Sequence, residues 1–147
     1  MSKSIVLLLI GLPGSGKTHL ANRIKDEDHQ YDWIIVDDPR DKSILVPLIE
    51  NFEDIIVTDP HLCNAKTRKE AIKYFQSNGY QVEFWYFENN PEKCMVNLKH
   101  RNDDRNIKTL KAFNYTIPKG IIPEKIWQPK VDKSHKNAIV ANAVPSP

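Results

Sequence analysis

The chain has 147 residues, a length that suits one domain with a single core. Hydrophobic residues make up 40% and charged residues 27%, which fits a soluble globular protein, and no apolar segment reaches the length of a membrane span. The net charge of +2 hides an asymmetry: residues 1–98 carry 11 Lys and Arg against 15 Asp and Glu, while residues 99–147 carry 10 against 4. The basic C-terminal third is either a surface for phosphate or nucleic acid or a solvated tail, and both readings stay open.

Apolar runs alternate with segments of helical periodicity, a pattern that predicts an α/β fold with a parallel sheet. The first apolar run, 4–10, leads straight into a glycine-rich segment without a cleavage site, so a buried strand explains it better than a signal peptide. In chain order we expect a strand at 4–10, a helix at 17–27, a strand at 33–36, a helix at 41–51, a strand at 54–58, a helix at 64–77, a strand at 80–87, and helices at 91–101 and 107–113.

The segment between the first strand and the first helix is a complete phosphate-binding loop, G-x-x-x-x-G-K-[ST], at residues 11–18. Its glycines let successive N–H groups point at one anion, and the following helix presents its positive end to the same anion. We expect Lys17 to reach the β- and γ-phosphates of a nucleoside triphosphate and the Thr18 hydroxyl to bind Mg²⁺. The loop residues expected to bind nucleotide are Gly11, Pro13, Gly14, Ser15, Gly16, Lys17 and Thr18.

Acidic residues follow the next two strands, where ligands of open α/β sheets bind. Asp37 and Asp38 end the second strand, and Asp37 is either a proton acceptor for a substrate hydroxyl or only a strand-end cap. Asp59 ends the third strand, where it could contribute to the Mg²⁺ shell or orient an acceptor. Because Pro60 follows instead of a glutamate, transfer to a bound acceptor is favoured over ATP hydrolysis.

Arg101 and Arg105 flank an acidic turn and are candidates for a mobile lid that neutralises phosphate charge, although pairing with Asp103 and Asp104 would also explain them. The region after residue 113 is rich in proline, and we expect Ile121-Ile122 and Ile126-Trp127 to pack on the body. Residues 139–140 form a short strand or no ordered element. We expect Trp33 and Trp85 in the core, assign no role to His61 or His100, and take the two separate cysteines as reduced thiols of a cytosolic protein.

Together these elements resemble the kinase domain of bacteriophage polynucleotide 5′-kinases and related small P-loop kinases over residues 4–113. The resemblance is carried by the loop at 11–18, by Asp37-Asp38-Pro39-Arg40, by Asp59 with the basic helix after it, and by Arg101-Asn102-Asp103-Asp104-Arg105. It implies that Asp37 is the general base toward a 5′-hydroxyl, that Arg40 contacts the phosphate beside the acceptor, and that Asp59 holds the acceptor side. It also implies a lid in which Arg105, more than Arg101, contacts the donor phosphates. Val36 and the acidic Asp103-Asp104 depart from the family pattern.

The sequence therefore predicts a P-loop kinase-type parallel β-sheet flanked by helices, with a short arginine-bearing lid and an irregular C-terminal extension. We expect a kinase domain at 1–127 and a C-terminal tail at 128–147, not necessarily ordered throughout. The predicted activity is transfer of the γ-phosphate of ATP, with Mg²⁺, to a 5′-hydroxyl DNA or RNA end in the cytoplasm, with Lys17, Asp37 and Arg105 in catalysis. Two alternatives remain at this point: a kinase of a nucleoside, nucleotide or other metabolite, and an ATP-binding regulator without turnover.

Overall fold

A computed structural model describes residues 4–39, 42–128, 131–132 and 138–139. Arg40 and most of the predicted tail at 128–147 lie outside these residues. In chain order the elements are β1 (Ile5–Ile10), α1 (Lys17–Glu27), β2 (Trp33–Asp37), η1 (Lys42–Ile44), α2 (Leu45–Glu50), β3 (Asp54–Thr58), η2 (Pro60–Cys63), α3 (Ala65–Ser77), β4 (Gln81–Tyr86), α4 (Pro91–His100), α5 (Asp104–Thr109), η3 (Leu110–Ala112), β5 (Val131–Asp132) and β6 (Ala138–Ile139). Here η denotes a 3₁₀-helix.

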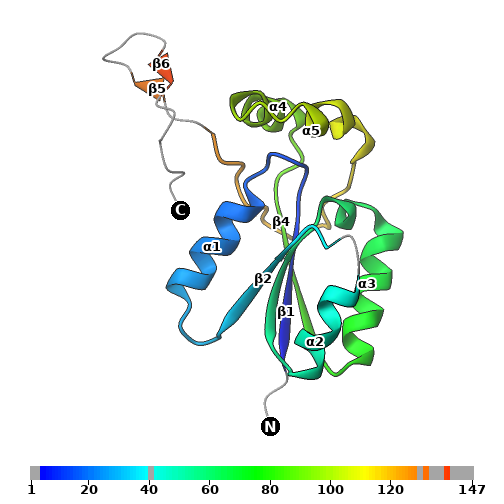
Figure 1. Cartoon of the computed structure of the whole chain (residues 1–147). Coiled ribbons are helices and arrows are strands. Elements are labelled where there is room, and N and C mark those ends of the chain that lie inside the picture. Colours follow the sequence, from blue (N-terminus) through cyan, green and yellow to red (C-terminus); the bar gives the residue numbers. More distant parts are fainter. Residues whose placement is uncertain (1–3, 40–41, 129–130, 133–137, 140–147) are drawn as a thin grey trace.

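The four main strands form a parallel sheet in the order β2-β3-β1-β4, which confirms the predicted α/β architecture. Helix α1 covers one face, α2 and α3 cover the other, and α4 and α5 lie beyond the carboxyl ends of the strands (Figure 1). All six residues of β1 are buried because this strand is central and covered on both faces. Its even-numbered residues pack with Phe75 on the α3 face, and its odd-numbered residues pack with Leu20 and Trp33 on the α1 face.

Two predicted helices differ in detail. The predicted helix at 41–51 is split into η1 and α2, and the apolar Ile44 at their junction is exposed. The predicted helix at 107–113 begins earlier, as α5, because the Asp103 side chain caps it by accepting a hydrogen bond from the Asn106 N–H at 3.3 Å. It then continues as η3.

The edge strand β4 corrects one prediction about the core. Trp33 is buried as expected, but Trp85 is 37% exposed. Strand β4 pairs only with β1 among the described elements, and its side chains alternate between exposed and partly buried. An aromatic residue in a strand therefore did not imply a core position here.

After η3 the chain returns to the sheet without forming a further long element. Glu124 makes a parallel bridge with Phe87, and the bridge brings Ile126 into the core. The expectation for Ile121 and Ile122 was wrong, since Ile122 is 92% exposed and Ile121 is also exposed. Ala138–Ile139 forms a short strand paired with β5, the first of the two alternatives given for residues 139–140, while Val140 lies outside the described residues. Within the described part of the chain, no helix is both long and apolar enough to cross a membrane.

Candidate functional site

The loop between β1 and α1 has a backbone that requires glycine. Gly14 and Gly16 have φ angles of +85° and +100°, in the left-handed region that side chains disfavour. A Cβ atom on Gly14 would lie 2.7 Å from the carbonyl oxygen of Cys94, so α4 packs directly against the loop. The loop closes on itself through a 3.1 Å hydrogen bond from the Ser15 N–H to the Leu12 carbonyl. These constraints produce the tight turn that precedes α1.

Lys17 places a buried amine inside this loop. Its Nζ donates hydrogen bonds to the carbonyl oxygens of Gly11 at 2.7 Å and Leu12 at 2.9 Å. The pKa of the amine falls from 10.5 to about 8, mainly because the amine is buried; Arg101 contributes to the fall, while Cys63, Cys94 and Asp37 oppose it. A cation that is costly to bury, and whose hydrogen bonds within the described residues go to carbonyl oxygens, suits an anionic ligand that could replace those contacts.

Two hydroxyl groups of the loop bear on whether the loop could hold a nucleotide phosphate together with Mg²⁺. The Ser15 hydroxyl is fully buried and, among the described residues, has no hydrogen-bond partner. Thr18 is exposed in the first turn of α1, beside the Lys17 backbone. Gly11 is also constrained, since a Cβ there would lie 2.6 Å from the Ser15 oxygen. The donor set and the narrow backbone therefore fit a phosphate group, with Thr18 available to a metal ion.

The loop is braced by Asn97, which the sequence analysis did not single out, and by Trp127, which it expected only to pack on the body. The Asn97 amide on α4 donates to the Gly14 carbonyl at 2.8 Å and also to the Trp127 carbonyl. The Trp127 ring packs against His19 with ring centroids 5.3 Å apart. A cavity of about 920 Å³ lies between this face of α1 and residues 122–128. Asn97 and Trp127 lie far from the loop in sequence, and no local pattern marks them.

Asp37 lies at the carboxyl end of β2, opposite Thr58 of β3 in the sheet register. Its Oδ1 accepts a 2.5 Å hydrogen bond from the Thr58 hydroxyl, which fixes the carboxylate at this edge. The Asp38 N–H donates to the Thr58 carbonyl at 2.7 Å, and Asp38 itself has a φ of +44°. The backbone therefore turns sharply after β2 and separates the directions of two consecutive carboxylates.

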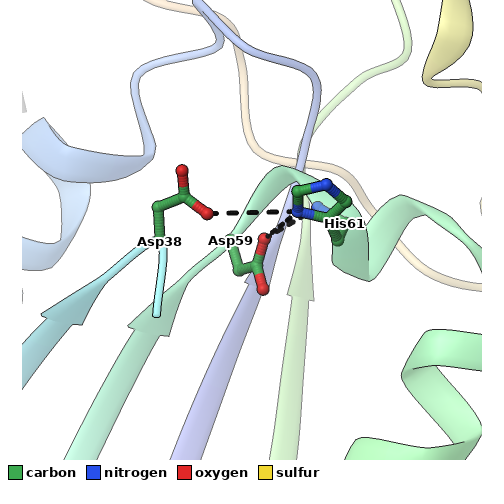
Figure 2. A group of neighbouring side chains, drawn as sticks. All are labelled: Asp38, Asp59 and His61. Carbon is green, nitrogen blue, oxygen red and sulfur yellow. Dashed lines mark hydrogen bonds and ion pairs between the residues drawn. The ribbon is translucent and has the colours of Figure 1, made fainter. Parts of the chain in front are cut away.

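Asp59 and His61 form a group with Asp38 beside this turn (Figure 2). Asp59 Oδ1 accepts a 2.9 Å hydrogen bond from the His61 N–H, as an N-cap of η2, and lies 2.9 Å from His61 Nδ1. The same ring nitrogen lies 4.0 Å from Asp38 Oδ1. His61, to which we assigned no role, thus joins two of the acidic residues at the strand ends.

The candidate arginines occupy different settings. Arg101 is bound by Asp103, with N···O distances of 2.9 and 3.1 Å, and its charge still acts on Lys17. Burial by itself would raise the pKa of Asp103. Hydrogen bonds from Asn106 and Arg101 outweigh this effect, so the pKa of Asp103 is lowered. Arg105 is exposed on α5. Arg68, from the predicted basic helix, donates to the carbonyls of Leu62 and Cys63 and so supports η2.

The two cysteines are free and buried close to the loop. Burial raises the pKa of both thiols to about 11, although the Lys17 charge opposes the rise. Both are therefore protonated at neutral pH and serve as small apolar residues that pack under the loop.

Comparison with known proteins supports the fold and defines a family. No protein-family model matches the chain. Three solved structures share its fold: APE1195 (TM-score 0.65, 18% identity, 84% of this chain and 87% of that chain), a fungal RNA kinase (0.55, 14%, 93% and 82%) and a gluconokinase from Sinorhizobium meliloti 1021 (0.53, 14%, 87% and 84%). The fold is therefore that of P-loop kinases, whereas a specific tie to bacteriophage polynucleotide kinases is not shown.

A viral protein is similar in sequence as well. The "Uncharacterized protein R277" of Acanthamoeba polyphaga mimivirus is 37% identical over 105 residues, which span 68% of this chain and 75% of the viral protein. A match of that length and identity extends well beyond an eight-residue loop. The chain therefore belongs to the same protein family as this mimivirus protein, on a P-loop kinase fold.

Proposed function

We propose that this protein transfers the γ-phosphate of ATP to a hydroxyl group, and that the acceptor is the 5′-hydroxyl end of a polynucleotide. The observation that carries the proposal is the position of Asp37. Its carboxylate lies at the carboxyl edge of the sheet, anchored by Thr58, and close enough to Lys17 for its charge to raise the pKa of that amine. Phosphoryl transfer to a hydroxyl requires a carboxylate that can accept the proton and a lysine that binds the phosphates.

The residues would divide the reaction as follows. The loop and Lys17 would hold the β- and γ-phosphates, and Thr18 would bind the Mg²⁺ that offsets their charge. As the acceptor oxygen bonds to the γ-phosphorus and the bond to ADP breaks, Asp37 would take the hydroxyl proton. Arg101 and Arg105 would supply positive charge over the phosphates, and Arg40 and Asp59 would hold the acceptor side.

Two observations favour a polynucleotide as the acceptor. The C-terminal third is basic, with 10 Lys and Arg against 4 Asp and Glu, which suits a polyanion. One neighbour in fold is an RNA kinase, with a TM-score of 0.55. The gluconokinase at 0.53 supports a second candidate, a small-molecule kinase on the same site.

A label-transfer assay tests the proposal. The protein is incubated with Mg²⁺ and γ-labelled ATP, together with 5′-hydroxyl DNA or RNA, the same strands carrying a 5′-phosphate, or a panel of nucleosides and sugars. We expect label only on the 5′-hydroxyl strands. Transfer to a nucleoside or sugar alone would establish the second candidate, and ATP binding without any acceptor-dependent ADP would refute both.

Variants assign the roles. Asp37→Asn should lower kcat by at least about 100-fold with ATP affinity kept, and Lys17→Ala should abolish turnover. Asp32→Asn is the matched control, since Asp32 is an exposed aspartate just before the other end of β2. Equal turnover of Asp37→Asn and Asp32→Asn would remove Asp37 from the base role.

A further inference from the structure

Three potential metal ligands converge at the carboxyl ends of β2 and β3. One oxygen of Asp38, one oxygen of Asp59 and one ring nitrogen of His61 all lie within 4.8 Å of one another (Figure 2). His61 Nδ1 is 2.9 Å from Asp59 Oδ1 and 4.0 Å from Asp38 Oδ1. The group combines an imidazole with two carboxylates, contributed by segments that are more than twenty residues apart in sequence.

The backbone holds each of these side chains in place. Asp59 is fixed where β3 ends and η2 begins, because its carboxylate caps η2. The Asp38 backbone is fixed by the hydrogen bond from its N–H to the Thr58 carbonyl and by its left-handed conformation, and its carboxylate lies 4.0 Å from the His61 ring nitrogen. The His61 ring packs edge-on against Phe113, with centroids 5.6 Å apart. The three groups therefore need only small side-chain rotations to bind one ion.

We propose that Asp38, Asp59 and His61 form a binding site for a divalent transition-metal ion of the Zn²⁺, Co²⁺ or Mn²⁺ class. Metal–ligand bonds of about 2.0–2.2 Å place neighbouring ligand atoms roughly 3.0–3.5 Å apart, depending on whether the geometry is octahedral or tetrahedral, and the observed 2.9 and 4.0 Å separations bracket that range. One nitrogen and two oxygen ligands suit these ions better than Ca²⁺, which takes six to eight oxygen ligands.

The site is open on one side. The side chain of His61 is 63% exposed and that of Asp38 is 36% exposed, whereas that of Asp59 is 15% exposed and lies deeper. Three protein ligands on an accessible ion leave coordination positions for water or for an oxygen of a bound molecule, as in zinc sites that act on ligands. An ion held here would lie on the edge of the sheet next to Asp37.

This ion is separate from the Mg²⁺ that the proposed function requires. Thr18, the residue expected to bind Mg²⁺, lies on α1 and is not part of the group. The inference therefore goes beyond the phosphotransfer proposal and can be tested without nucleotide or turnover. A negative kinase assay would not contradict the metal site, and absence of metal binding would not contradict the kinase proposal.

The test is a titration of the metal-free protein with Co²⁺, followed by visible absorption, and with Zn²⁺, followed by calorimetry. We expect one equivalent to bind per chain in the absence of nucleotide. His61→Ala and Asp38→Asn should each weaken that binding by at least about tenfold. Because the side chains of His61 and Asp38 are accessible to solvent, both variants should fold, which circular dichroism checks. The two variants test two different metal ligands independently.

Two controls separate this site from other binding. His29→Ala removes an exposed histidine elsewhere and should bind the ion as the wild type does. Thr18→Ala should also retain binding. Absence of one-equivalent binding, equal affinity in His61→Ala and His29→Ala, or loss of the ion in Thr18→Ala would each overturn the proposal. The hydrogen-bonded Asp59–His61 pair would then be a structural contact alone.

Discussion

Replacing Lys17 with methionine should remove a buried charge that destabilises the fold. The amine is 8% exposed, and burial lowers its pKa from 10.5 to about 8. Since each pKa unit corresponds to about 1.4 kcal/mol, the charged amine costs the folded state about 3 kcal/mol. Between pH 8 and 10.5 the unfolded chain binds the proton that the folded chain has released, so stability rises with pH across this window. The penalty is full below pH 8 and is relieved by pH 10.5.

The assay is urea unfolding of the wild type and Lys17→Met from pH 7 to 10.5, followed by tryptophan fluorescence. The free energy of unfolding of the variant minus that of the wild type should fall by about 3 kcal/mol over this range. Tyr80 has a pKa raised by burial, which acts in the opposite direction, but it is present in both proteins and cancels in the difference. Cys63 and Cys94 act in the same direction as Tyr80 and are coupled to Lys17, but they titrate in the unfolded chain near pH 9, where the folded Lys17 amine is already largely neutral, so they change the difference little. Lys25→Met, at an exposed lysine of α1, is the control and should show a constant difference. A constant difference for Lys17→Met as well would refute the reasoning.

Three further substitutions test the packing around the loop. Gly14→Ala should cost more than about 2 kcal/mol of stability and weaken ATP binding, because the φ of Gly14 is positive and the new Cβ would lie 2.7 Å from a carbonyl oxygen. Gly79→Ala is the control in the same urea titration. Gly79 has a similar φ with open space around it, so this substitution should cost only about 1 kcal/mol. Asn97→Ala leaves the Gly14 carbonyl without its side-chain donor, and it removes one of the two side-chain hydrogen bonds to the Trp127 carbonyl, the other being donated by Gln128 at 3.1 Å. We expect a loss of about 1–2 kcal/mol and a change in Trp127 fluorescence, and an unchanged spectrum would contradict the proposed brace. Tyr115→Phe removes one buried hydrogen bond to a backbone carbonyl and should lower the thermal midpoint by an amount equivalent to about 1 kcal/mol, whereas an unchanged midpoint would show that this bond adds no net stability.

The first third of the molecule was the easiest to predict. Strand β1, the loop at 11–18 and α1 were all placed correctly from contiguous residues. Six consecutive aliphatic residues indicate a strand covered on both faces, and the spacing of glycines and lysine requires a particular turn. Each of these signals is local, so no distant contact was needed to interpret it.

The errors lie where burial depends on neighbours. Trp85 and Ile122 are apolar residues that we expected to be covered, yet both are exposed. Trp85 is on an edge strand, and Ile122 is in the segment that returns after η3. Hydrophobicity predicts that a side chain would gain from burial, but only the packing of the whole chain determines which ones are covered.

The amino-acid sequence by itself determined the α/β class, the tight glycine turn at residues 11–18 and the acidic residues at two strand ends, because backbone propensity and motif spacing act over a few residues. Only the tertiary structure decided that Asp38 and His61 approach each other, since that contact depends on the pairing of Asp37 with Thr58 between β2 and β3. It likewise decided that Asn97 on α4 bridges Gly14 and Trp127. Such contacts join residues far apart in the chain, and their geometry follows from strand register and helix packing, which no short stretch of sequence specifies.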